Sequence, residues 1–100
     1  MLYEPFNIDG DKICTVAEIR HFRIAHGQNE FNVYKYTIEV NYLTLPVEYQ
    51  FQDFWIYRYT NGDWVDGLDN HSLCYKIKDR ISHQETGNFR QYVKEYVDRA

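Results

Sequence analysis

Residues 31–43, FNVYKYTIEVNYL, alternate regularly between two kinds of side chain. Successive side chains of a β-strand point to opposite faces of its sheet, so this period of two predicts a strand with one buried face. A half-buried strand needs neighbouring strands and a second layer that covers its apolar side. The apolar side consists of Tyr34, Tyr36, Ile38, Val40 and Tyr42, and the polar side of Lys35, Thr37, Glu39 and Asn41.

The preceding segment, 12–26, fits two structures. Thr15 followed by Glu18 matches a helix capping box, whereas the mixture of β-branched and charged residues suits a strand with one solvated side. We favour the strand, because residues 27–30, GQNE, are suited to close a hairpin with 31–43.

Turn residues divide the rest of the N-terminal part. Residues 1–11 are expected to form an ordered lead-in that ends in a turn at 7–11. Pro46 lacks an N–H group and restricts the residue before it, so we expect pairing to stop there and a new strand to begin near Val47.

Asn61-Gly62 is typical of a two-residue type I′ hairpin, because both residues tolerate positive φ. With such a loop, Tyr59 faces Trp64, and directly opposed residues share a face of the sheet. One side then carries Trp55, Tyr57, Tyr59, Trp64 and Asp66, and the other carries Phe54, Ile56, Arg58, Thr60, Asp63 and Val65.

The period changes to that of a helix after Gly67. Leu73, Ile77 and Ile81 predict a helix at about 72–84, and apolar residues at i, i+3, i+4, i+7 and i+8 from Phe89 predict another at about 89–99. Strands followed by helices indicate an α+β fold. We therefore expect one domain, 1–100, with an antiparallel sheet of three to five strands at about 12–66 and both C-terminal helices packed on one face.

Six of the fourteen residues in 51–64 are aromatic. Two short helices cover only one face of a sheet, so one set of these rings is expected to stay exposed, and exposed apolar patches mark interaction surfaces. Trp and Tyr are enriched at interfaces, which places Phe54, Ile56 and Val65 in the core. The alternative is that the side with four aromatic rings is itself the core. The predicted partner-binding residues are Trp55, Tyr57, Tyr59 and Trp64, with Asp53 and Asp66 attracting a basic partner.

The sequence contains no catalytic, metal-binding or cofactor-binding signature. The four His residues lack the spacing of a zinc site, and Cys14 and Cys74 form no Cys-x-x-Cys motif, so two buried free thiols are expected. No glycine-rich phosphate loop is present. We expect no cofactor, no metal and no enzymatic activity; a small enzyme with a scattered Tyr, His and Asp site is an alternative.

The net charge of −4 disfavours a broad nucleic-acid surface, because phosphate binding requires clustered Lys and Arg. Lys76, Lys78 and Arg80 are a short basic cluster, so single-stranded nucleic-acid binding is a minor alternative. No leader or membrane-spanning run is recognised, and a cytoplasmic location is expected. The leading hypothesis is a small protein-binding module, such as a stand-alone inhibitor or immunity-type protein; the second is a homodimer that pairs through the same patch.

Overall fold

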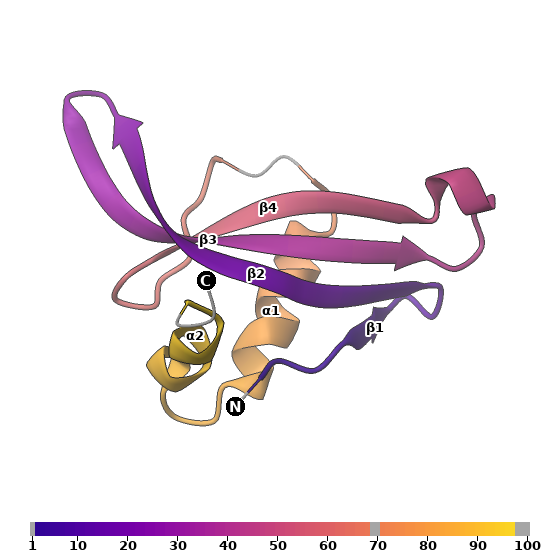
Figure 1. Ribbon diagram of the computed structural model, residues 1–100. Helices are drawn as coiled ribbons and strands as arrows, with labels where there is room; N and C mark the ends of the chain where they lie inside the picture. The colour runs from indigo at the N-terminus through magenta and orange to yellow at the C-terminus, as the bar shows by residue number, and fades with distance from the viewer. Residues whose placement is uncertain (1, 69–70, 98–100) are drawn as a thin grey trace.

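Four antiparallel strands followed by two helices make up the computed structural model, which describes residues 2–68 and 71–97 (Figure 1). This confirms the predicted α+β fold. The predicted end of the second helix, at 98–99, lies outside the described residues. The strands are β1 (Phe6–Ile8), β2 (Lys12–His26), β3 (Asn29–Tyr42) and β4 (Phe51–Tyr59), adjacent in that order, with a short 3-10 helix, η1 (Val47–Tyr49), before β4; the helices are α1 (Cys74–Gln84) and α2 (Phe89–Val97).

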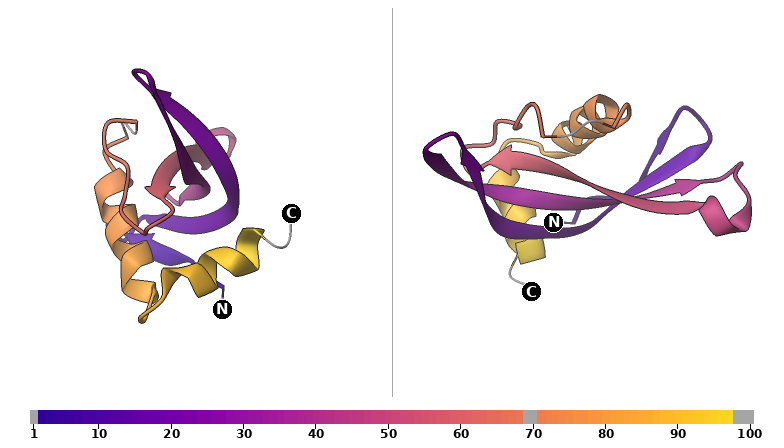
Figure 2. Two further views of the ribbon diagram at one scale, coloured as in Figure 1. Left: turned by 90° about the vertical axis from the view of Figure 1, so that its left-hand side faces the viewer. Right: turned by 90° about the horizontal axis from the view of Figure 1, so that it is seen from above.

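Strands β2 and β3 form the long hairpin that the sequence predicted, which settles 12–26 as a strand. His26 pairs with Asn29 across a two-residue loop, and Gly27 in this loop adopts a φ of 66°. A glycine with positive φ at the first loop position is the requirement of a type II′ turn, which matches the twist of the flanking strands. The end of this hairpin bends away from the helices (Figures 1 and 2).

The N-terminal lead-in contains a short strand that the sequence analysis did not predict. Strand β1 pairs with the start of β2, and the predicted turn joins them. Asp9 and Gly10 have φ values of 58° and 79°, so both are in the left-handed conformation. Asp and Gly tolerate this conformation better than most residues, which suits them to this tight connection. Three residues give little period to recognise, which explains why the strand was missed.

The connection from β3 to β4 corrects the predicted start of the next strand. Residues 47–49 form η1, and β4 begins at Phe51 rather than near Val47. The predicted interruption at Pro46 is present, and the Tyr42 N–H group donates to the Gln50 carbonyl at 2.7 Å, which closes the loop behind η1. This loop forms one end of the elongated molecule (Figure 1).

The predicted two-residue turn at Asn61-Gly62 is wrong. The Tyr59 N–H group donates to the Asp63 carbonyl at 2.7 Å, so three residues, 60–62, form the loop, and only Gly62 has a positive φ, of 105°. The Asn61 side chain instead accepts the Asp63 N–H group at 2.9 Å, an Asx turn. The extra loop residue shifts the register by one, so Trp64 pairs with Arg58 and not with Tyr59.

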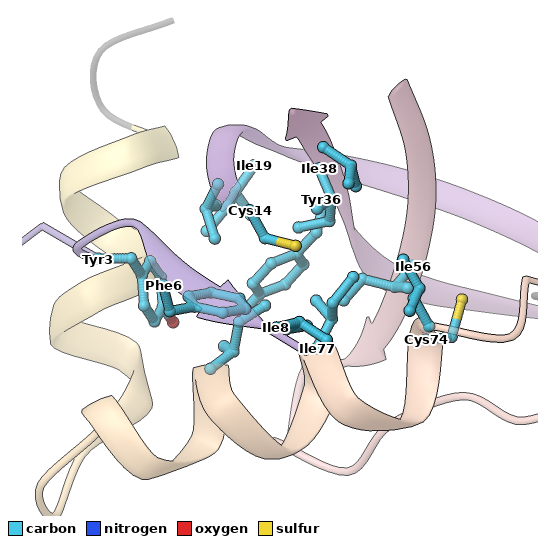
Figure 3. Packing of buried hydrophobic residues seen from close by; sticks show 14 of the residues in the cluster. Tyr3, Phe6, Ile8, Cys14, Ile19, Tyr36, Ile38, Ile56, Cys74 and Ile77 are labelled. Carbon is cyan, nitrogen blue, oxygen red and sulfur yellow. The ribbon is translucent and has the colours of Figure 1, made fainter. Parts of the chain in front are cut away.

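The hydrophobic core lies between the sheet and the helices (Figure 3). Alternate residues of β3, among them Tyr36 and Ile38, are fully buried on this side and meet Ile77 of α1. Cys14 and Cys74 are buried free thiols in this core, as predicted. The helices therefore cover one face, here called the inner face, and the opposite face is called the outer face.

Candidate functional site

The outer face carries a group of aromatic side chains from three strands. In the β3–β4 register, Lys35 lies opposite Tyr57 and Thr37 lies opposite Trp55, all on this face, and Lys35 also lies opposite Arg20 of β2. We call the five rings on and beside this face the aromatic cluster: Phe22, Phe31, Trp55, Tyr57 and Tyr59.

Four rings of the aromatic cluster form two contacting pairs, and several of its rings remain open to solvent. The centroids of Phe22 and Tyr57 are 5.9 Å apart, and those of Phe31 and Tyr59 are 6.0 Å apart. Phe22, Phe31 and Trp55 nevertheless keep exposed fractions of 42%, 37% and 48%. Large rings held this far in solvent outside the core are typical of an interaction surface.

A cation lies within the cluster. The Lys35 Nζ atom is 5.2 Å from the centroid of Phe22 and 5.0 Å from that of Trp55. Both distances are within the range of cation–π attraction, so the two rings hold the lysine in a defined position.

A cavity of about 350 Å³ adjoins the cluster, between the end of the β2–β3 hairpin and residues 64–68. Its apolar walls include Ile24, Phe31, Tyr59, Val65 and Leu68, and Asp66 contributes a carboxylate. A cavity of this size accepts one or two apolar side chains.

The structure brings only some of the predicted partner-binding residues together. Trp55, Tyr57, Tyr59 and Asp53 lie on the outer face, as expected, and Asp66 lines the cavity. The prediction for Trp64 is wrong in its placement. Its indole N–H group donates to the Ser82 Oγ atom at 3.1 Å and its ring contacts Tyr36, so it packs against the core on the inner face.

The sequence analysis missed Phe22, Phe31 and Lys35 as members of this surface. The signal was present in the hairpin at 27–28: a two-residue loop places Phe22 opposite Val33 and Phe31 opposite Ile24. Val33 is fully buried although it lies on the outer face, which shows that the aromatic cluster forms a small apolar layer of its own.

Charges on the outer face are grouped by sign. Arg20 lies directly opposite Lys35, and Glu39 lies directly opposite Asp53. Like charges in directly opposed positions repel, so both pairs disfavour the isolated sheet. Arg20 has a partner in Glu18 at 3.5 Å, but Lys35, Glu39 and Asp53 have no ion-pair partner among the described residues.

The inner face contains a buried ion pair. Two guanidinium nitrogens of Arg58 donate to the Glu85 carboxylate at 2.6 and 2.8 Å, and the side chains of Arg58 and Glu85 are only 7% and 5% exposed. Arg58 also donates to the Gly62 carbonyl at 2.7 Å and to the Tyr36 hydroxyl at 3.2 Å, while the Tyr3 hydroxyl donates to Glu85. The pair therefore ties β4, the end of α1 and the N-terminal segment together.

Burial controls the titration of the groups around this ion pair. Desolvation raises the pKa of Tyr3 well above its usual value, with repulsion from Tyr36 and the bond to Glu85 acting in the same direction. Desolvation also raises the pKa of Tyr36, although Arg58 opposes the shift. These shifts keep both phenols neutral, which suits members of a closed hydrogen-bond network, in which Tyr3 donates to Glu85 and Tyr36 accepts from Arg58, rather than groups that react with a substrate.

The basic residues of α1 take part in internal contacts. The Lys76 ammonium group lies 2.7 Å from the Asp9 carboxylate, and Arg80 donates to the Asn7 carbonyl at 2.8 Å. Both contacts anchor α1 to the segment around β1. They leave these two cations less available to a phosphate backbone than the sequence alone indicated.

The described residues contain no group of three or more His, Cys, Asp or Glu side chains placed to hold a metal ion. A search of the same residues for a helix with the length and hydropathy of a membrane span found none. No protein-family model, curated protein or solved structure significantly matches the chain.

Proposed function

We propose that the chain is a non-enzymatic protein-binding module that uses its outer face to bind another protein chain. The observation that carries the proposal is the aromatic cluster, whose Phe22, Phe31 and Trp55 rings stay more than one third exposed although they form one contiguous surface. Interfaces concentrate their binding energy in Trp and Tyr side chains of this kind.

The form of the surface supports a protein ligand. The sheet gives the rings a rigid base, and Lys35 is held by two of them, so little conformational freedom is lost when a partner docks. The adjoining cavity provides a pocket for an apolar anchor of the partner. A stand-alone inhibitor or an immunity-type protein, acting by occlusion, is consistent with these features.

The electrostatics of the inner face support a structural role there. Arg58 and Glu85 neutralise each other within a nearly closed network, and burial keeps the neighbouring phenols neutral. A catalytic acid or base needs a pKa near the working pH and access to its substrate. The outer face, which is open, carries the proposed function instead.

Alanine substitution at Trp55 tests the proposal. Because Trp55 is 48% exposed and lies outside the core, Trp55→Ala should leave the fold intact and remove a central part of the binding surface. Tyr75→Ala is the matched control, since Tyr75 is an aromatic residue of α1 that is 87% exposed. The tagged form of the wild type or of each variant is mixed with a native cell extract that also contains the untagged chain. The proteins captured by the tagged form are then quantified.

Capture of a stoichiometric protein that is lost with Trp55→Ala and retained with Tyr75→Ala is the expected result. Equal capture by the wild type, Trp55→Ala and Tyr75→Ala would refute the assignment of partner binding to the outer face. Circular dichroism of each variant confirms that a loss of capture does not reflect unfolding.

A further inference from the structure

We infer that the outer face binds the outer face of a second copy of the chain, in a two-fold symmetric dimer. This inference rests on the proposed function, because it names the partner of the same surface. The observation behind it is the order of charged and apolar groups along the face. When a second copy is turned end to end and placed against the first, opposite charges face each other.

Two opposite charges lie at equal distances on either side of the middle of β3. Lys35 and Glu39 lie on the outer face, two residues before and two residues after Thr37. A two-fold axis between two facing sheets, running across the strands at the level of Thr37, reverses the strand direction. It therefore places each Lys35 opposite the Glu39 of the other copy. Two charges that lack an ion-pair partner among residues 2–68 and 71–97 of the single chain then neutralise each other twice.

The same axis matches the groups on β4. Trp55 is paired with Thr37, so the two Trp55 rings meet near the axis. Tyr57 comes opposite Asp53 of the other copy, where its hydroxyl is able to donate to the carboxylate. Arg20 and Lys35 repel each other within one sheet. The end-to-end reversal keeps this basic pair away from the same basic pair of the other copy.

The two ends of the face are also complementary in shape. The loop around η1 exposes apolar side chains, with Val47, Tyr49 and Phe51 at 79%, 61% and 60%. Hydrogen bonds hold this loop in place: the Gln50 side chain donates to the Leu45 carbonyl at 3.2 Å, and the Gln52 side chain donates to the Tyr49 carbonyl at 3.1 Å. A rigid apolar projection of this kind fits an apolar cavity, and the cavity beside the aromatic cluster lies at the opposite end of the same face.

The distances along the strands agree with this arrangement. Strand β3 ends at Tyr42, five residues beyond Thr37, and Phe31 of the cavity lies six residues before it. At about 3.4 Å per residue, these are about 17 Å and about 20 Å from the axis. Reversal of one copy therefore brings each η1 loop to the cavity of the other. The end of the β2–β3 hairpin bends away from the helices (Figures 1 and 2), so in this dimer it lies beside that loop.

Charge reversal tests the dimer while leaving every ring of the aromatic cluster in place. In sedimentation velocity over a concentration series of the full chain, the wild type should show a reversible monomer–dimer equilibrium. Lys35→Glu and Glu39→Lys should each weaken dimerisation at least about tenfold, because two symmetric contacts become repulsive. An equimolar mixture of the two variants should restore the dimer, since every carboxylate then faces an ammonium group.

Each substitution should leave the single chain folded, because it replaces a like-charged cross-strand pair with an opposite pair: Lys35→Glu opposite Arg20, and Glu39→Lys opposite Asp53. Lys94→Glu, an equal charge change at an exposed position of α2, is the control and should dimerise like the wild type. Val47→Ala is an uncharged second test: Val47 is 79% exposed, so its loss should weaken the dimer without affecting the fold.

A wild type that stays monomeric throughout the series would overturn the inference, as would a mixture of the two charge variants that fails to restore dimerisation. If the chain is monomeric but captures a different protein through Trp55, the dimer is refuted and the proposed function is retained. If capture is also insensitive to Trp55→Ala, both fail.

Discussion

Substitution of Arg58 should cost the protein a large part of its stability. In Arg58→Met the side-chain volume is largely kept, but the Glu85 carboxylate remains buried without its cation. Breaking a buried ion pair from one side costs about 3–5 kcal/mol. The guanidinium carbon also lies 4.4 and 4.5 Å from the ring centroids of Trp64 and Phe89, and these cation–π contacts are lost as well. Because a domain of this size is stable by only about 5–15 kcal/mol, the variant should be close to unfolding in water.

Urea unfolding followed by circular dichroism measures this loss, with Arg23→Met as the matched control. Arg23 also pairs with a carboxylate, that of Glu30 at 3.6 Å, but both side chains are about two-thirds exposed, so its removal should have little effect.

A double-mutant cycle separates the charge from the packing. Arg58→Met with Glu85→Leu removes both buried charges, so the double variant should be more stable than either single variant, although Tyr3 and Tyr36 lose hydrogen-bond partners. A double variant whose loss of stability equals the sum of the two single losses, or a loss of less than about 1 kcal/mol in Arg58→Met, would show that the buried ion pair does not stabilise the fold in this way.

Two further predictions concern the loop and the core. Gly62→Ala should destabilise the protein by about 1–3 kcal/mol in urea unfolding, because φ is 105° and a Cβ atom would lie 2.9 Å from the Phe89 ring. Gly67→Ala is the control and should lose less stability, because Gly67 also has a positive φ, of 88°, but no atom lies within 4 Å of its Cβ position. Desolvation raises the pKa of Cys14 from 9.0 to about 11, so its contribution to stability should be complete below pH 9 and decline as the pH rises from 9 toward 11. Accordingly, the stability advantage of the wild type over Cys14→Ala should shrink across that range; an advantage that stays constant would contradict this assignment.

Most of the fold was predictable because it depends on local periodicity. The alternation in 31–43 and the helical spacing after Gly67 each describe which side of an element is buried, and both were confirmed. The boundaries of β4 were less accurate, because Val47 and Tyr49 have strand-like side chains but follow Pro46, which favours the tight 3-10 turn. Side-chain type alone did not decide between these structures.

The candidate site was predictable in part, and the misplacement of Trp64 has one physical origin. Asn61-Gly62 fits two hairpin loops that differ by one residue, and a shift of one residue moves a side chain to the opposite face. Trp64 was therefore placed beside Tyr59, whereas the structure places it on the inner face, over the Arg58 guanidinium group. Gly62 lies so close to Phe89 of α2 that a Cβ atom there would be 2.9 Å from the ring, and no local sequence pattern reports this proximity.

The sequence alone was sufficient to predict that strands precede two helices, which side of β3 is buried, and that the chain has more aromatic side chains than two helices are able to cover. These properties depend on spacing along the chain, which the sequence states directly. The folded structure was needed to show which rings share the outer face, that Lys35 lies between Phe22 and Trp55, and that Arg58 is buried with Glu85. Each of those facts depends on register and on packing between residues distant in sequence, where the free energy is set by contacts that no single segment contains.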